Sequence, residues 1–202
     1  MTLATRRVGL FGGAFDPPHS AHRALIEAAL TALRLDSLLV LPTGQPWHKQ
    51  RDVSPVAQRL AMAQLAFGDL PRVQVDWRET NRTGATYTVD TLRELHAEQP
   101  GTDFFLIIGQ DQAQALQTWR EWAVVVQLAI ICVAMRPDAC GALPQFVPPV
   151  GLEQRFLPLS APTMSVSATA IRARCARGEP VLGLVSDTVA RYIALHHLYQ
   201  TT

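Results

Sequence analysis

Short apolar runs recur along the chain, separated by stretches long enough to hold a helix. Most positions are hydrophobic in Val8–Phe11, Leu38–Leu41, Val73–Val75, Phe104–Ile108 and Ile130–Ala134. Strands with one wet face alternate apolar and polar residues, whereas strands covered on both faces read as nearly continuous apolar runs. The pattern therefore predicts the buried strands of a parallel sheet.

The segments between these runs have helical periodicity. It predicts helices over Ala21–Leu33, over Pro55–Phe67 with Ser54 as the N-cap, and over Val89–Ala97. Strands that alternate with helices form βαβ units, whose ligands bind at the carboxyl ends of the strands. The expected fold is α/β, a single-domain Rossmann-like doubly wound parallel sheet.

A helical pair is predicted at the C-terminal end. Ala168–Arg177 ends at Gly178 as a C-terminal cap, and Asp187–His196 begins after Ser186 or at Asp187. The proline-rich stretch Pro137–Pro149 reads as a surface loop rather than a domain boundary. We therefore expect one domain over residues 1–202, with a C-terminal helical part from about 165.

Composition limits the classes of binding partner and the cellular compartments that we expect for this protein. The net charge of +1 gives no reason to expect a nucleic acid or an anionic membrane as partner. The longest apolar stretch, Ala123 to Met135, is interrupted by Gln127 and is too short to span a bilayer. The cysteines show no paired spacing, which favours a reducing compartment and a cytoplasmic location. A homo-oligomer stays open.

The strongest chemical signal follows the first apolar run. Residues 12–22 read Gly-Gly-Ala-Phe-Asp-Pro-Pro-His-Ser-Ala-His. Adjacent glycines suit a sharp turn or the close approach of a ligand. His19 and His22 share one face of the first helical turn, where a helix N-terminus favours anions. The string predicts a site for a nucleotide triphosphate. A purely structural turn, or half of a zinc site, is the alternative.

A second string supports the same chemistry. In Ser165–Arg172, Ser167 can cap a helix whose first turns carry Arg172. A capping serine with an arginine is common and is weak evidence alone. Paired with the first motif, it predicts a triphosphate held between two helix N-termini, two histidines and an arginine.

Read together, the two strings resemble the adenylyltransferase branch of the nucleotidylyltransferase superfamily. Further strings are Pro42–Lys49, Thr86–Leu92, and Ile107–Asp111 followed by Thr118 and Trp119. With them the chain resembles bacterial nicotinate-nucleotide adenylyltransferases over nearly its whole length. Two positions depart from that family's pattern: Trp47, where proline is frequent, and Arg120, where an aromatic residue is frequent.

The resemblance implies roles for individual residues. It makes His19, His22 and Arg172 catalytic. It implies ATP binding by Gly12, Gly13, Phe15, His19, His22, Gly109, Asp111, Arg136, Ser167, Thr169, Ile171 and Arg172. It implies acceptor binding by Asp16, His48, Lys49, Tyr87, Thr88, Asp111 and Trp119, with Trp119 stacked on a pyridine ring.

The same residues also have plainer interpretations. Trp119 could be an amphipathic cap on the sheet edge, and Lys49 a solvated surface residue. Asp16 could orient a histidine or cap the turn, and Asp111 could begin a helix.

The expected reaction is direct in-line attack by a phosphate oxygen of nicotinate mononucleotide on the α-phosphorus of ATP. No serine, cysteine or lysine stands beside an evident base, and nucleotidyl transfer needs no covalent relay. A Mg²⁺ ion would be held mainly by phosphates and water, without dedicated protein ligands. The alternatives are adenylyl transfer to nicotinamide mononucleotide or phosphopantetheine, and a non-catalytic nucleotide-sensing module.

Overall fold

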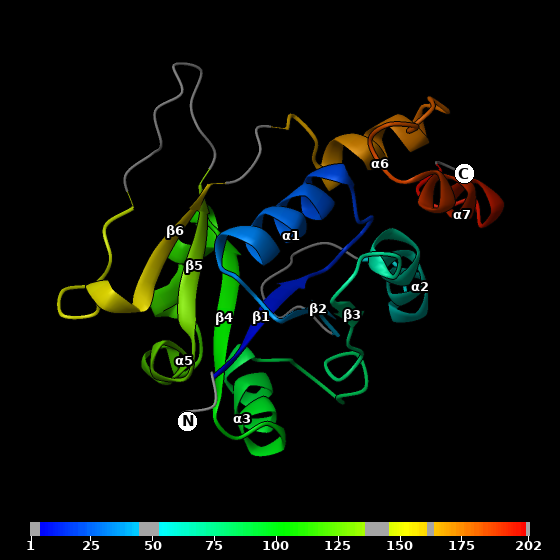
Figure 1. The fold of residues 1–202 in the computed structure, drawn as a ribbon. Coiled ribbons are helices and arrows are strands. Elements are labelled where there is room, and N and C mark those ends of the chain that lie inside the picture. Colours follow the sequence, from blue (N-terminus) through cyan, green and yellow to red (C-terminus); the bar gives the residue numbers. More distant parts are fainter. Residues whose placement is uncertain (1–4, 45–52, 136–145, 161–163, 201–202) are drawn as a thin grey trace.

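A computed structural model describes residues 5–44, 53–135, 146–160 and 164–200 (Figure 1). The strands are β1 (Arg6–Gly13), β2 (Ser37–Pro42), β3 (Val73–Val75), β4 (Thr102–Gly109), β5 (Ile130–Met135) and β6 (Phe156–Ser160). The α-helices are α1 (Ser20–Ala32), α2 (Val56–Phe67), α3 (Thr88–Glu98), α4 (Gln110–Gln114), α5 (Trp122–Leu128), α6 (Ala168–Ala176) and α7 (Asp187–Leu195). Two 3₁₀ turns are η1 (Leu116–Thr118) and η2 (Glu153–Arg155).

All six strands belong to one parallel sheet in the order β3-β2-β1-β4-β5-β6. The chain builds outward from β1 in one direction and then from β4 in the other. The carboxyl ends of β1 and β4 therefore form the switch point where ligands bind in such sheets. The predicted fold class, a doubly wound parallel α/β sheet, is confirmed.

Alternate strand residues supply two cores, one on each face of the sheet. From β4, Phe105 and Ile107 pack with apolar residues of α1, α2, α6 and α7. Phe104, Leu106 and Ile108 point to the opposite face and pack with residues of α3, α4 and α5. Figure 1 shows the helices divided between the two faces in this way.

The structure adds α5 and β6 to the predicted elements. The apolar stretch from Ala123 to Met135 contains most of α5 and then β5, with an extended break at Ala129. Strand β6 was not predicted, because it contains Pro158, a residue that is rare within sheets, and only Phe156 and Leu159 of its residues are buried.

Two local predictions were wrong. Ser54 does not cap α2: Pro55 occupies the N-cap position, and the Ser54 carbonyl instead accepts a hydrogen bond from Arg59. Of the two roles expected for Gly12 and Gly13, the sharp turn is wrong: they are the last two residues of β1, and the left-handed backbone follows at Phe15, where φ is 48°.

The N-terminal ends of the two C-terminal helices lie where the sequence predicted them. Ser167 accepts a hydrogen bond from the amide of Ala170, and Ser186 accepts one from the amide of Val189, so both serines are N-caps. Across the parts of the chain that the structure covers, no helix has the length and apolarity needed to cross a membrane.

Candidate active site

One pocket of about 340 Å³ opens at the carboxyl ends of β1 and β4, and we call it the strand-end pocket. It is lined by residues 11–16, His19, His22, Thr43, Glu79, Thr86, Tyr87, Thr88, residues 106–109, Gln112, Trp119, Arg120 and Ala168. His19, Thr88, Gly109 and Ala168 cap or begin α1, α3, α4 and α6 respectively. Since a helix N-terminus carries partial positive charge, the walls favour an anionic ligand.

The two predicted histidines lie together at one side of this pocket. His19 is the N-cap of α1, and its backbone N–H donates to Nδ1 of His22 at 3.2 Å. The imidazoles stack with centroids 3.6 Å apart, and the Phe15 ring meets His22 edge-on at 5.2 Å. Because Nδ1 of His22 accepts this bond, a neutral His22 carries its proton on Nε2 and can donate from there.

The glycine pair gives the ligand room. Gly12 is exposed at the pocket, and among the described residues a Cβ there would touch only the Leu41 carbonyl oxygen, at 3.9 Å. A Cβ on Gly13 would lie 3.1 Å from the tip of the Phe15 ring. Side chains at these positions would either fill the pocket or displace Phe15.

The second motif lies beside the first, although most of it is not in the pocket wall. Ala168 lines the pocket, and Ser167 and Thr169 are exposed next to it. Arg172 donates to the backbone carbonyl of Asp16 at 2.7 Å and to the Thr169 hydroxyl at 3.1 Å. Ile171 is fully buried and packs in the core. Arg172 therefore joins α6 to the turn after β1.

Asp16 is only 2% exposed and links distant parts of the chain. Its carboxylate accepts a hydrogen bond from the hydroxyl of Tyr199 at 2.7 Å and one from the amide of Ser54 at 3.3 Å. The burial of Tyr199 beside this carboxylate raises the pKa of its hydroxyl, so the phenol stays protonated and donates.

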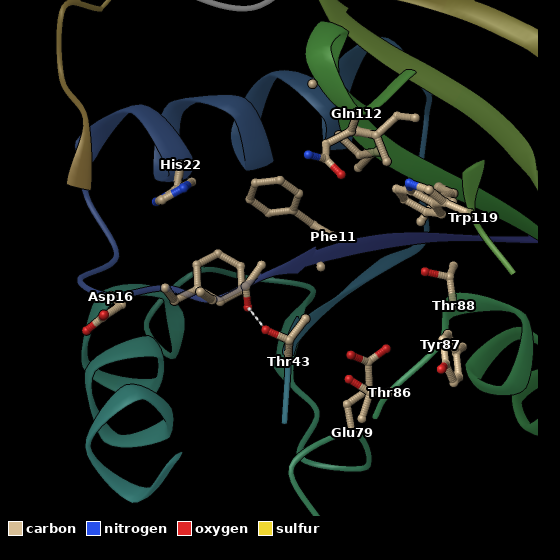
Figure 2. A pocket seen from close by; sticks show the side chains of 18 of the residues that line it. Phe11, Asp16, His22, Thr43, Glu79, Thr86, Tyr87, Thr88, Gln112 and Trp119 are labelled. Atoms are coloured by element: carbon tan, nitrogen blue, oxygen red, sulfur yellow. Dashed lines mark hydrogen bonds between the residues drawn. The ribbon is translucent and has the colours of Figure 1, made fainter. Parts of the chain in front are cut away.

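The opposite side of the pocket is aromatic and polar. Figure 2 shows Tyr87, Thr88 and Trp119 across the pocket from His22 and Asp16. Trp119 is half-buried and packs against the core on the α3 face. The Arg120 guanidinium lies 4.7 Å from the centroid of the Tyr87 ring. This side combines a flat apolar surface with the N-terminus of α3.

Sequence reasoning missed several lining residues. Glu79 is 6% exposed, accepts a 2.8 Å hydrogen bond from the Thr91 hydroxyl, and has its pKa raised by burial. Thr86 is also 6% exposed, and its hydroxyl has no hydrogen-bond partner within the described residues. Thr86 does lie inside a string that resembles the family, whereas nothing local distinguishes Glu79.

Some predicted residues are not in the pocket wall or cannot be placed. Asp111 is exposed on α4 and does not line the pocket, while its neighbour Gln112 does. His48, Lys49 and Arg136 lie outside the described residues, so their roles stay predictions. Within the described ranges, no three His, Cys, Asp or Glu side chains gather as they would around a metal ion.

The chain resembles known proteins over nearly all of its length. Residues 10–174 match the family model described as cytidylyltransferase-like. A protein of Albidiferax ferrireducens named "Probable nicotinate-nucleotide adenylyltransferase" is 57% identical over 97% of this chain and 99% of its own. A protein of Herpetosiphon aurantiacus with the same name is 41% identical over 96% of this chain and 98% of its own.

The fold also matches a solved structure. The nicotinic acid mononucleotide adenylyltransferase of Plasmodium falciparum, complexed with NaAD, superposes with a TM-score of 0.75. The match covers 96% of this chain and 97% of that one at 15% identity, so it supports the fold.

Proposed function

This chain belongs to the nicotinate-nucleotide adenylyltransferase family within the cytidylyltransferase-like proteins, and we propose that the strand-end pocket is where it joins ATP to nicotinate mononucleotide. The products are nicotinate adenine dinucleotide and pyrophosphate. This reaction is a step of NAD biosynthesis. The observation that carries the proposal is the pocket itself. It combines stacked histidines at a helix N-terminus with an aromatic wall on the opposite side.

The reaction follows from position and charge. A phosphate oxygen of the acceptor attacks the α-phosphorus of ATP, the bond to the β-phosphate bridging oxygen breaks, and pyrophosphate leaves with that electron pair. His22 donates from Nε2 to phosphate oxygens as charge shifts toward the leaving group. Arg172 of α6, whose guanidinium is bonded to the turn after β1, adds a fixed positive charge.

The state of the pocket carboxylates fits a Mg²⁺ ion that is bound by the ATP phosphates, and not one that is coordinated mainly by protein side chains. The Asp16 carboxylate already accepts bonds from Tyr199 and Ser54, and burial favours the protonated form of Glu79. Phosphate oxygens and water would therefore hold the ion, as is usual for this metal. When bound, it would neutralise phosphate charge.

The acceptor end favours an acid over an amide. Helix α3 begins at Thr88, which lines the pocket, so its first amides and its dipole favour a carboxylate on the pyridine ring. Trp119 offers a ring face on which the pyridine can stack. An amide would leave one of its groups poorly matched to these donors.

A pyrophosphate-release assay tests the proposal. ATP is supplied with nicotinate mononucleotide, nicotinamide mononucleotide or phosphopantetheine as the acceptor. We expect the highest kcat/KM with nicotinate mononucleotide. Equal efficiency with the amide would overturn the acceptor assignment, and no pyrophosphate with any acceptor would identify a nucleotide-sensing module instead.

Location and domain organisation stay predictions. We propose that residues 1–202 act as one domain, because α6 and α7 pack on the same core as α1 and α2. A cytoplasmic location is supported by Cys132 and Cys175, which are buried free thiols. Burial raises the pKa of Cys132 to about 12, so this thiol is unreactive.

A further inference from the structure

Arg59, on α2, is a fully buried arginine behind the wall of the strand-end pocket. Its guanidinium donates from Nε and from both terminal nitrogens to backbone carbonyls. The bonds run to Ser54 at 2.9 Å, to Ala14 at 3.0 Å, to Thr43 at 2.7 Å and to Gly44 at 2.9 Å. One side chain therefore holds four backbone carbonyls in fixed positions relative to one another.

These carbonyls come from three separate segments of the chain, two of which line the pocket. Ala14 belongs to the turn after β1, where Phe15, Asp16 and His19 also line the pocket. Thr43 and Gly44 follow β2, and Thr43 lines the pocket as well. Gly44 and Ser54 flank, in the sequence, the stretch that contains His48 and Lys49.

A cation in such a place is costly. Burial lowers the pKa of Arg59, and the Asp16 charge offsets this only in part. An apolar side chain would fill the space without that cost, but it could not hold these carbonyls at fixed spacing. The arrangement is what a positioning role requires, since the guanidinium presents its donors in a rigid planar fork.

We propose that Arg59 is a positioning residue for adenylyl transfer. It sets the distance between the turn that faces the ATP phosphates and the end of β2, so that the attacking oxygen and the α-phosphorus are aligned. Arg59 itself does not line the pocket. The proposal rests on the proposed function and names a residue that acts through the backbone.

The test compares kcat with ATP binding in Arg59→Lys. An ammonium donates from one point and cannot span these carbonyls. We expect kcat per folded molecule to fall about 100-fold, the scale of a 1 Å misplacement, while the Kd of ATP alone changes less than about threefold. Circular dichroism at the assay temperature gives the folded fraction.

Arg155→Lys is the matched control. Arg155 also binds two backbone carbonyls, those of Val126 and Gln127, each at 2.8 Å. It precedes β6 at the amino edge of the sheet and does not line the pocket. We expect this variant to keep the wild-type kcat, because loss of a carbonyl-bound arginine alone does not misalign the substrates.

Arg59→Gln provides a second variant that buries no charge. If Arg59→Lys does not fold, a folded Arg59→Gln with low kcat and intact ATP binding supports the proposal. Wild-type kcat in either folded variant overturns it, as does a failure of both to fold, which would make Arg59 purely structural. A wild-type protein that releases no pyrophosphate overturns the proposed function, and the positioning role with it.

Discussion

The hydroxyl of Tyr199 donates to Oδ1 of Asp16 at 2.7 Å, across 183 residues of the chain. Tyr199 follows α7, whereas Asp16 lines the strand-end pocket. The C-terminal segment is thereby tied to the turn that carries the histidines.

Removing this hydroxyl is expected to destabilise the protein. Tyr199→Phe leaves a buried carboxylate without one donor, which should cost about 1.5–3 kcal/mol of the free energy of unfolding. Urea unfolding measures this cost. Tyr192→Phe, on the partly exposed face of α7, is the control and should change the midpoint little. Equal midpoints for Tyr199→Phe and wild type would show that the bond adds nothing to stability.

His22 serves both as a cap and as a donor, and two substitutions separate these roles. Asn can supply an acceptor near the position of Nδ1, which accepts from the His19 amide, whereas Gln can supply an N–H near that of Nε2. We expect His22→Ala and His22→Asn to lower kcat about 10²- to 10³-fold, and His22→Gln to lose less. Steady-state kinetics decides the order. We expect His19→Ala to lower kcat as well. Wild-type turnover in His22→Ala would remove His22 from the mechanism.

Arg172 is expected to bind phosphate through its planar fork. Arg172→Ala should raise the KM for ATP and lower kcat, and Arg172→Lys should recover only part of both. Initial rates over a range of ATP concentrations measure the two constants. Because Arg172 also bonds the Asp16 carbonyl, unfolding temperatures of both variants serve as the control for local loosening. Full activity in Arg172→Lys would exclude a bidentate role.

Trp119 is expected to bind the acceptor and not ATP. Trp119→Ala should weaken nicotinate mononucleotide binding by about 1–3 kcal/mol, the range for stacking on an aromatic side chain. Calorimetry with each substrate separates the two effects. Trp77, which is 59% exposed and does not line the pocket, gives the control Trp77→Ala. Unchanged acceptor affinity in Trp119→Ala would mean that this tryptophan only covers the core.

Glu79 should make stability depend on pH. Burial raises its pKa above the ordinary 4.5, so the folded protein keeps this proton to higher pH than the unfolded chain does. The contribution of Glu79 to the free energy of unfolding is complete at acid pH and is lost as pH rises through the pKa of the folded state. Glu79→Gln keeps an acceptor for Thr91 and removes the titration. We expect the variant to gain stability relative to wild type as pH rises above 4.5.

Urea titrations at several pH values measure this difference. Glu27→Gln is the control, since Glu27 lies on the exposed side of α1 and pairs with Arg23. A constant difference between Glu79→Gln and wild type at every pH would show that Glu79 is ionised equally in both states.

The sequence by itself determined strands β1 to β5, helices α1, α2, α3, α6 and α7, and the phosphate-binding motif, because these depend on neighbours along the chain. Apolar runs between helical segments predict buried parallel strands, and a spacing of three places His19 and His22 on one helical turn. The caps at Ser167 and Ser186 were predictable for the same reason.

Only the tertiary structure decided which distant residues support the pocket. Arg59 and Glu79 look like ordinary surface charges in the sequence, yet both are buried, Glu79 in the wall of the strand-end pocket and Arg59 behind it. The hydrogen bond between Tyr199 and Asp16 joins residues that lie 183 positions apart in the sequence. These relationships arise when crossovers bring separate strand ends to one edge of the sheet, and no local pattern encodes that meeting.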